Sequence, residues 1–391
     1  MTTNQASNDS DAIQSFHINI PQSALDDLKY RLEWTRWPDR ETVNDWKQGV
    51  PLDKAKSLVD YWRLYYDWRR FENRANKYPH FRTTIDGVGI HFIHVRSEHA
   101  NALPIILTHG WPGSFIEFLH VIPRLTNPTA FGGKAEDAFH VVVPSIPGYG
   151  FSDKPTEAEW HTARIARAWV LLMQRLGYQK WVAQGGDWGA DVATILGFIR
   201  PIGLLGIHLN FQYVFPEDQF DNFSPDEQRA IDGASQYLTD GSGFFQQQST
   251  RPQTIGYGLC DSPVALAMYI YEKFYEWTDN KGEPEDAVKI DDILDNITLY
   301  WLTNTGASAA RLFWERQLLG MSLAGPTLYL PVAASVFPRE VFRAPKSWAQ
   351  QKYPNLIYWN ELEKGGHFAA FEQPEVFAKE LAAAFRTLRN A

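Results

Sequence analysis

The chain has 391 residues and a net charge of −9 at pH 7, from 37 basic and 46 acidic side chains that are spread along it. Because it contains no basic run, this balance excludes a nucleic-acid-binding surface, while a hydrophobic content of 44% is enough for a large core with additions. One cysteine, Cys260, excludes an intramolecular disulfide, and without an apolar run of about 18 residues no membrane-spanning helix is expected, so we expect a cytoplasmic protein.

A helical region is predicted for the N-terminal part of the chain. Residues 1–12 are polar and are expected to be disordered. Beyond them, apolar side chains recur every three or four residues, the spacing of a helix, at Leu25, Leu28, Leu32, Leu58, Trp62, Tyr65 and Trp68. Residues 83–95 then predict a hairpin with Asp86 and Gly87 as its turn, so 13–95 is interpreted as a helical region that ends in a hairpin.

Residues 96–212 have the pattern of an alternating unit. Four short apolar runs are interpreted as buried parallel strands, at 105–107, 141–143, 181–183 and 206–209. Stretches with helical spacing lie between them, notably at 115–125 and 162–176. Because strands and helices alternate, the predicted fold class is α/β, and these residues are the first part of its core.

The alternation stops between residues 213 and 324. That segment is helical and rich in aromatic residues, as expected of a cap inserted over the carboxyl edge of the sheet. Two further strand candidates follow, at 327–332 and 356–359, and a final helix is predicted over 374–388. Residues 325–391 are therefore assigned to the second part of the core.

Asp187 lies in a glycine-rich segment, Gly185-Gly186-Asp187-Trp188-Gly189, between the predicted strand 181–183 and a helical segment. Glycines tolerate the positive φ and the close approach of a strained turn, so this context predicts a nucleophile elbow with aspartate in place of serine. A carboxylate is suited to displace a leaving group from a saturated carbon and so become an alkyl ester. The alternative, a helix N-cap, does not explain the flanking glycines.

Such an ester must be cleaved by water, which requires a base. His367 follows the last strand candidate, and Glu340, which follows the strand before, can hold its tautomer. Glu361 and Glu363 are alternatives to Glu340. The chain order Asp187, Glu340, His367 is that of the α/β-hydrolase fold, so we predict this fold with an inserted helical cap and a helical N-terminal extension.

The loop 109–114 directly follows the predicted strand 105–107. In the α/β-hydrolase fold this loop and the residue after the nucleophile supply the oxyanion-hole amides, so Trp111 and Trp188 are the predicted donors. A plain Gly-Pro turn is the alternative for the loop. A second candidate elbow around Ser308 follows helical sequence rather than a strand and is set aside.

Together these motifs resemble the epoxide hydrolases of the α/β-hydrolase superfamily, in the branch that includes the microsomal and fungal enzymes. The matching stretches are 18–37, 109–115, 144–150, 185–189, 249–254, 261–264, 300–303 and 365–368. The resemblance implies Asp187 as the nucleophile, Glu340 and His367 as the pair that activates water, and a cap above them. The membrane anchor of the microsomal relatives is not expected in this chain.

The resemblance also implies two cap tyrosines whose hydroxyls bond the epoxide oxygen, and these positions fall at Phe244 and Phe313. Neither phenylalanine has a hydroxyl, although an epoxide opens to an alkoxide that needs a proton or a strong hydrogen bond. Three explanations compete: a donor from elsewhere, a variant of low epoxide activity, or a leaving group such as halide that needs no proton. The donor candidates are Tyr213, Tyr237, Tyr257 and Tyr269, or, for halide, the indoles of Trp111 and Trp188.

The sequence therefore predicts an enzyme that converts a small apolar epoxide to a vicinal diol through an ester on Asp187. Phe244 and Phe313 are the predicted substrate-binding residues, and no metal or cofactor is expected. A haloalkane-dehalogenase-like hydrolase and a non-catalytic binding protein are the alternatives. Neither nucleic acid nor a membrane is expected as a partner, and the oligomeric state is left open, with a homodimer among the alternatives.

Overall fold

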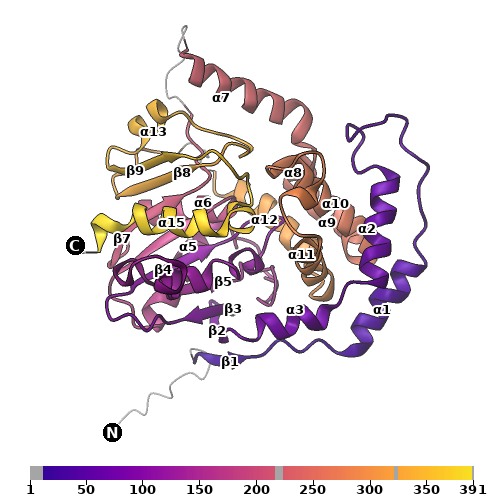
Figure 1. Cartoon of the computed structure of the whole chain (residues 1–391), viewed down its shortest axis with the longest axis horizontal. Coiled ribbons are helices and arrows are strands. Elements are labelled where there is room, and N and C mark those ends of the chain that lie inside the picture. The colour runs from indigo at the N-terminus through magenta and orange to yellow at the C-terminus, as the bar shows by residue number, and fades with distance from the viewer. Residues whose placement is uncertain (1–11, 216–222, 321–324, 390–391) are drawn as a thin grey trace.

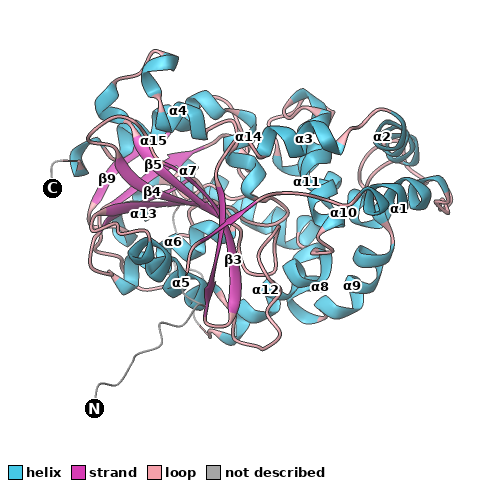
Figure 2. Cartoon of the chain, turned by 90° about the horizontal axis from the view of Figure 1, so that it is seen from below, coloured by secondary structure: helices cyan, strands magenta, loops and turns pink. Residues whose placement is uncertain are grey.

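The computed structural model describes residues 12–215, 223–320 and 325–389, so the N-terminal segment predicted to be disordered lies almost entirely outside the described residues. Within them, one nine-stranded sheet forms the centre (Figures 1 and 2). Its order is β1 (Gln14–Phe16), β2 (His80–Ile85), β3 (Val88–Val95), β5 (Phe139–Pro144), β4 (Leu103–Thr108), β6 (Trp181–Gly185), β7 (Leu204–Leu209), β8 (Val332–Val336) and β9 (Leu356–Glu361). The strands from β5 to β9 are parallel, whereas β1, β2 and β3 extend the sheet antiparallel.

Helices cover both faces of the sheet, and the parallel strands are apolar for that reason. On one face lie α5 (Thr162–Arg175) and α6 (Trp188–Ile199), and on the other lie α4 (Ile122–Thr126) and α15 (Pro374–Ala384). Strands β4 and β5 contribute runs of Ile, Leu and Val with no exposed surface at their centres. This is the composition expected of strands buried on two sides.

A second group of helices packs beside the sheet. It consists of α8 (Gly243–Thr250), α9 (Pro252–Asp261), α10 (Pro263–Trp277), α11 (Ile290–Leu302) and α12 (Gly306–Leu318), with α7 (Pro225–Gln236) at its upper end in Figure 1. The N-terminal helices α1 (Gln22–Glu33), α2 (Leu52–Leu64) and α3 (Trp68–Ala75) contact α10 and α11 from outside. Two shorter helices, α13 (Lys346–Lys352) and α14 (Ala369–Glu372), follow β8 and β9. No helix in the described parts of the chain has both the length and the apolar character needed to span a bilayer.

Most predicted elements are confirmed, and the exceptions have physical causes. The hairpin is formed by β2 and β3, with Asp86 and Gly87 both at positive φ in its turn. The strand predicted over 327–332 is wrong in position, because the observed strand β8 begins only at Val332. Pro331, directly before it, lacks the N–H that a central strand needs. Upstream, the Leu328 N–H instead bonds the Lys352 carbonyl at 2.9 Å.

Two further differences concern helices, and one concerns a strand. The helix predicted over 115–125 is split into a 3₁₀ turn, Phe115–Phe118, and α4, because Pro123 favours the first turn of a new helix over a helix interior. The N-terminal region also contains β1, whose three residues are too few for a periodic pattern. The final helix ends at Ala384, and a 3₁₀ turn, Arg386–Leu388, follows it.

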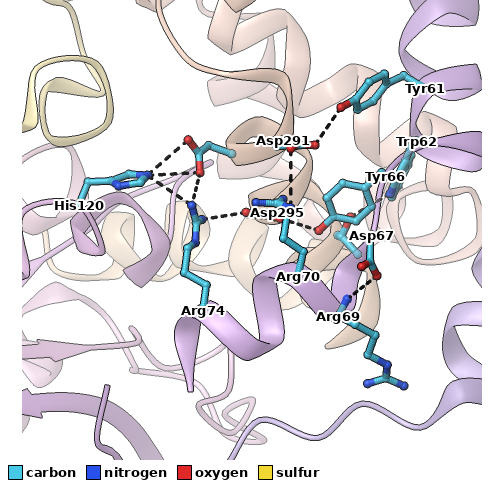
Figure 3. Close-up of polar contacts among 12 residues, drawn as sticks. Tyr61, Trp62, Tyr66, Asp67, Arg69, Arg70, Arg74, His120, Asp291 and Asp295 are labelled. Carbon is cyan, nitrogen blue, oxygen red and sulfur yellow. Dashed lines mark hydrogen bonds and ion pairs between the residues drawn. The ribbon is translucent and has the colours of Figure 1, made fainter. Parts of the chain in front are cut away.

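A buried ionic network joins the N-terminal helices to α11 (Figure 3). Arg70 and Arg74 of α3 reach the two oxygens of Asp295 at 2.7 and 2.8 Å, and the Tyr66 hydroxyl donates to Asp295 at 2.7 Å. The Asp295 side chain is fully buried, and the two arginines keep 36% and 27% of their side-chain surface exposed. A buried carboxylate is tolerated only with such partners, so Asp295 fixes α3 against α11.

We predict that Asp295→Asn lowers the free energy of unfolding by about 3 kcal/mol, because two guanidinium groups then face a neutral amide. Asp291→Asn is the matched control on the same helix, since Asp291 is 35% exposed and lies 3.7 Å from Arg70. It should cost less than about 1 kcal/mol. Urea unfolding of both variants checks this, and equal losses would contradict the assigned role of Asp295.

Candidate active site

The turn between β6 and α6 holds Asp187 in a strained conformation, with φ 48° and ψ −127°. This region of positive φ is rare for a residue other than glycine, and such strain persists where the surrounding structure enforces it. A Cβ added at Gly185 would overlap the carbonyl of Gly189, and one at Gly189 would overlap the carbonyl of Thr108. Both glycines are therefore required for the turn to close, as expected of a nucleophile elbow.

The carboxylate of Asp187 is held from two sides. The backbone N–H of Trp111 donates to Oδ1 at 2.7 Å, and Nε2 of His367 lies 3.4 Å from Oδ2. Gly110, which precedes Trp111, has no room for a side chain, because a Cβ there would overlap Asp187 itself. The loop after β4 and the elbow thus fit together only with glycine at position 110.

His367 is bonded to Glu340 on its other side. Its Nδ1 lies 2.6 Å from Oε1 of Glu340, and the two side chains are 6% and 1% exposed. Glu340 follows β8 and His367 follows β9, so both lie at the carboxyl ends of neighbouring parallel strands, as Asp187 does after β6. The alternatives Glu361 and Glu363 are exposed, and Glu361 instead accepts a bond from Trp359.

The charges around His367 set its protonation state. Burial alone would lower its pKa, but the carboxylates of Glu340 and Asp187 outweigh burial and raise the pKa of His367 well above its usual value. An imidazolium between two carboxylates is the resting form. If Asp187 became an ester its charge would be lost, and one cause of the raised pKa of His367 would disappear with it.

The second predicted oxyanion donor, Trp188, begins α6 directly after Asp187. Its N–H is in the first turn of the helix, where backbone donors have no carbonyl partner within the helix. Its indole Nε1 is also buried and finds no hydrogen-bond partner among the described residues. Of the two predicted donors, the Trp111 N–H contacts the Asp187 carboxylate in the structure. The role of the Trp188 N–H stays a prediction.

Helix α11 holds the loop that carries Trp111, which the sequence did not predict. The Asn296 amide donates to the Pro112 carbonyl and accepts from the Ser114 hydroxyl, each at 2.7 Å. The Tyr300 hydroxyl donates to the Gly113 carbonyl at 2.7 Å. The stretch 300–303 was among the matching motifs in the sequence, but it does not indicate which loop the helix contacts.

An aromatic enclosure surrounds the site. Phe244 of α8 stacks on Trp111, with ring centroids 4.8 Å apart and planes 9° apart. Phe313 of α12 meets Trp111 edge-on at 5.6 Å and Trp188 at 4.7 Å. Trp277 lies 5.2 Å from Phe244 and 5.0 Å from His367. Phe244 and Phe313 are thus brought together beside the elbow, and both present apolar rings.

The four tyrosines considered as donors lie in different surroundings. Tyr257 is 71% exposed on α9 and so cannot reach a buried site. The Tyr269 hydroxyl is buried and has no hydrogen-bond partner within the described parts of the chain, and the Tyr269 ring lies edge-on to Trp111 with ring centroids 5.6 Å apart. For Tyr213 and Tyr237, burial first and the charge of Asp187 second raise the pKa above its ordinary value. These two phenols are therefore neutral and lie within the electrostatic reach of Asp187.

Comparison with known proteins relates nearly the whole chain to epoxide hydrolases. The model of the epoxide hydrolase N terminus matches residues 13–118, and that of the α/β hydrolase fold matches residues 104–208. A Stigmatella aurantiaca protein whose name classes it with the epoxide hydrolases is 64% identical, over 96% of this chain and 86% of that protein. Epoxide hydrolase 1 of Sus scrofa is 35% identical, over 96% of this chain and 89% of the relative.

Two solved structures have the same architecture. The Aspergillus niger epoxide hydrolase has a TM-score of 0.85 at 32% identity, over 97% of each chain. The juvenile hormone epoxide hydrolase of Bombyx mori has a TM-score of 0.89 at 30% identity, over 97% of this chain and 95% of that one. The similarity thus includes the helices beside the sheet as well as the sheet itself.

We predict that Gly110→Ala reduces hydrolytic turnover at least ~100-fold, because a methyl group at this position displaces the Asp187 carboxylate. Gly258→Ala on α9 is the matched control, since no described residue lies within 4 Å of its added Cβ, and it should leave turnover unchanged. Steady-state rates and melting temperatures of the two variants test this. Full turnover in folded Gly110→Ala would contradict the tight fit between the loop and the elbow.

Proposed function

The chain belongs to the epoxide hydrolase family of the α/β-hydrolase fold and is an epoxide hydrolase, and from this premise we propose how its residues open the ring. The substrate is a small apolar epoxide, the product is a vicinal diol, and Asp187 becomes an alkyl ester between the two. The observation that carries this proposal is the position of the Asp187 carboxylate, 2.7 Å from the Trp111 N–H and 3.4 Å from His367. Family membership disfavours the alternative of a non-catalytic binding protein.

In the first step, a carboxylate oxygen of Asp187 attacks one ring carbon, the carbon–oxygen bond breaks, and its electron pair stays on the epoxide oxygen. That oxygen takes a proton from its hydrogen-bond donor, which solvent reprotonates, and His367 releases its own proton to solvent once the charge of Asp187 is lost. Phe244 and Phe313 form apolar walls that bind the hydrocarbon part of the substrate. The aromatic enclosure also keeps water from competing with the carboxylate.

In the second step, water attacks Cγ of the ester. Neutral His367 accepts a proton from this water, and Glu340 stabilises the resulting imidazolium. The Trp111 and Trp188 amides stabilise the tetrahedral oxyanion. The acyl–oxygen bond then breaks, and the diol oxygen leaves with the electron pair and takes the proton from His367. Asp187 is left as an acid that carries the second proton of the water, and it passes this proton to His367, so that the carboxylate and the imidazolium are both regenerated.

The epoxide oxygen needs a hydrogen-bond donor, and we propose Tyr213 and Tyr237 for this role. Both phenols are buried enough to stay neutral, and the charge of Asp187 acts on each of them. Phe211 links Tyr213 to the site, because its ring lies 4.3 Å from Tyr213 and 5.6 Å from His367. The Tyr237 ring meets Phe244 at 6.5 Å. These contacts support a donor pair other than the one that the resemblance implied.

Replacing the base should separate the two steps. In His367→Gln, alkylation by styrene oxide should continue while ester hydrolysis stops, so intact-protein mass spectrometry should find one equivalent of adduct on Asp187. Asp187→Ala is the control that forms no adduct. If His367→Gln accumulates no adduct while the wild-type enzyme turns over, the two-step route is wrong.

Removing the proposed donors should slow only the first step. Tyr213→Phe and Tyr237→Phe should each reduce the single-turnover alkylation rate with styrene oxide by roughly 100-fold, the typical loss for one donor to developing charge. The rate of ester hydrolysis should stay the same. Exposed Tyr257→Phe is the matched control and should behave as the wild type.

The same variants distinguish the halide alternative. Turnover of 1-bromobutane needs no proton on the leaving group, so any such activity should be insensitive to both tyrosine substitutions. Full epoxide activity in Tyr213→Phe and Tyr237→Phe would rule out the proposed donors. A gain of epoxide activity in Phe244→Tyr with Phe313→Tyr would then identify a variant of low activity instead.

A further inference from the structure

A buried ion pair joins helix α6, which begins directly after the nucleophile, to helix α12. Nε of Arg316 donates to Oδ2 of Asp191 at 2.6 Å, and Nη2 of Arg316 donates to Oδ1 at 3.3 Å. Arg316 is 7% exposed and Asp191 is 5% exposed. The guanidinium and the carboxylate thus form a forked pair shielded from water, and such a pair has a more strictly fixed geometry than a contact between apolar side chains.

The Asp191 carboxylate also bonds a third helix. The Thr162 hydroxyl, in the first residue of α5, is fully buried and donates to Oδ2 of Asp191 at 2.6 Å. Since α5 and α6 both cover the sheet, Asp191 links these two helices to α12, which lies beside the sheet. Removing Arg316 would take away the countercharge of a buried carboxylate, which is unfavourable. The three side chains therefore form a polar junction between the helices that cover the sheet and those that lie beside it.

This junction lies one helical turn beyond the aromatic enclosure of the site. On α6, Trp188 lies three residues before Asp191, and on α12, Phe313 lies three residues before Arg316. The rings of Trp188 and Phe313 meet edge-on, with centroids 4.7 Å apart. Because residues three apart lie on the same face of a helix, α6 and α12 touch at two successive levels, one aromatic and one ionic. The ionic contact therefore fixes the register of the aromatic one.

The opposite end of α12 is held as well. The Ala309 carbonyl, in the first turn of this helix, accepts a hydrogen bond from the Tyr149 hydroxyl at 3.0 Å. Phe313 thus lies between this anchor and the one at Arg316. Apolar contacts are not directional, so the ring contacts of Phe313 do not by themselves select one register of α12 on α6. A forked ion pair does select one.

We propose that Asp191 and Arg316 are positioning residues that set the width of the substrate site, because their ion pair fixes the Phe313 ring against the nucleophile elbow. Both residues act through Phe313 and neither contacts the substrate. The proposal rests on the proposed function, in which Phe313 is an apolar wall of the site. A fixed wall rejects a substrate that is too wide for it, so the ion pair contributes to discrimination among epoxides by size.

Size discrimination is measured as the ratio of kcat/KM for styrene oxide, which carries a phenyl group, to kcat/KM for naphthyloxirane, which carries a wider naphthyl group. Phe313→Ala removes the wall and should lower this ratio roughly 10-fold, the effect that a small change of size has in a hydrophobic pocket. Arg316→Met should lower it by a similar factor, because Phe313 is then no longer held. Arg386→Met is the matched control and should leave the ratio unchanged, since it breaks an ion pair with Asp137, before the amino end of β5 and so at the opposite edge of the sheet.

A further variant separates positioning from stability. In the triple variant Thr162→Val, Asp191→Leu, Arg316→Met, apolar side chains replace the whole junction, a change that is often neutral for stability. The triple variant should therefore melt at a higher temperature than Arg316→Met, while its size discrimination stays as low. Arg316→Lys keeps the charge without the fork, so it should recover only part of the ratio.

Wild-type discrimination in the triple variant, or in folded Arg316→Met, would overturn the proposal, because the ion pair would then act on stability alone. If Phe313→Ala has lowered discrimination in the same experiment, the proposed wall stands and only the role of the ion pair falls. Unchanged discrimination in Phe313→Ala would overturn the wall and the proposal together. Failure of the covalent route is read separately, from the absence of an adduct in His367→Gln.

Discussion

The site depends on how one carboxylate is held. Asp187 lies at positive φ in a turn that needs glycine at 185 and 189, and its oxygens contact the Trp111 N–H and the His367 ring. These contacts orient the carboxylate before substrate binds, so little reorganisation is needed in the alkylation step. The strain is retained because β6, α6 and the loop after β4 pack too closely for another backbone conformation.

The N-terminal helices support this arrangement from a distance. Asp295 of α11 holds Arg70 and Arg74 of α3, and the next residue, Asn296, holds the loop that carries Trp111. Helix α11 thus connects an ionic network on one side with the oxyanion loop on the other. Because neighbouring residues on a helix are rigidly related, the N-terminal region contributes to the position of a catalytic amide without contacting substrate.

The sequence predicted the sheet and the residues of the site better than it predicted their surroundings. The strands around Asp187 and the relation of Glu340 and His367 to strand ends follow from local patterns. The predicted strand 327–332 lies too early in the chain, because its apolar side chains resemble those of a buried strand. The observed strand β8 begins only after Pro331. The contact of Asn296 with Pro112 joins residues that are far apart in the chain, and no local pattern specifies such a pairing.

The charges of the site also explain how His367 becomes a base after the first step. The resting site contains two carboxylates, Asp187 and Glu340, and one imidazolium, His367. Under the proposed mechanism, alkylation removes one negative charge at Asp187, and His367 then releases its proton to solvent, so the net charge of the site is unchanged. Alkylation therefore converts His367 into a base at the moment when water must attack.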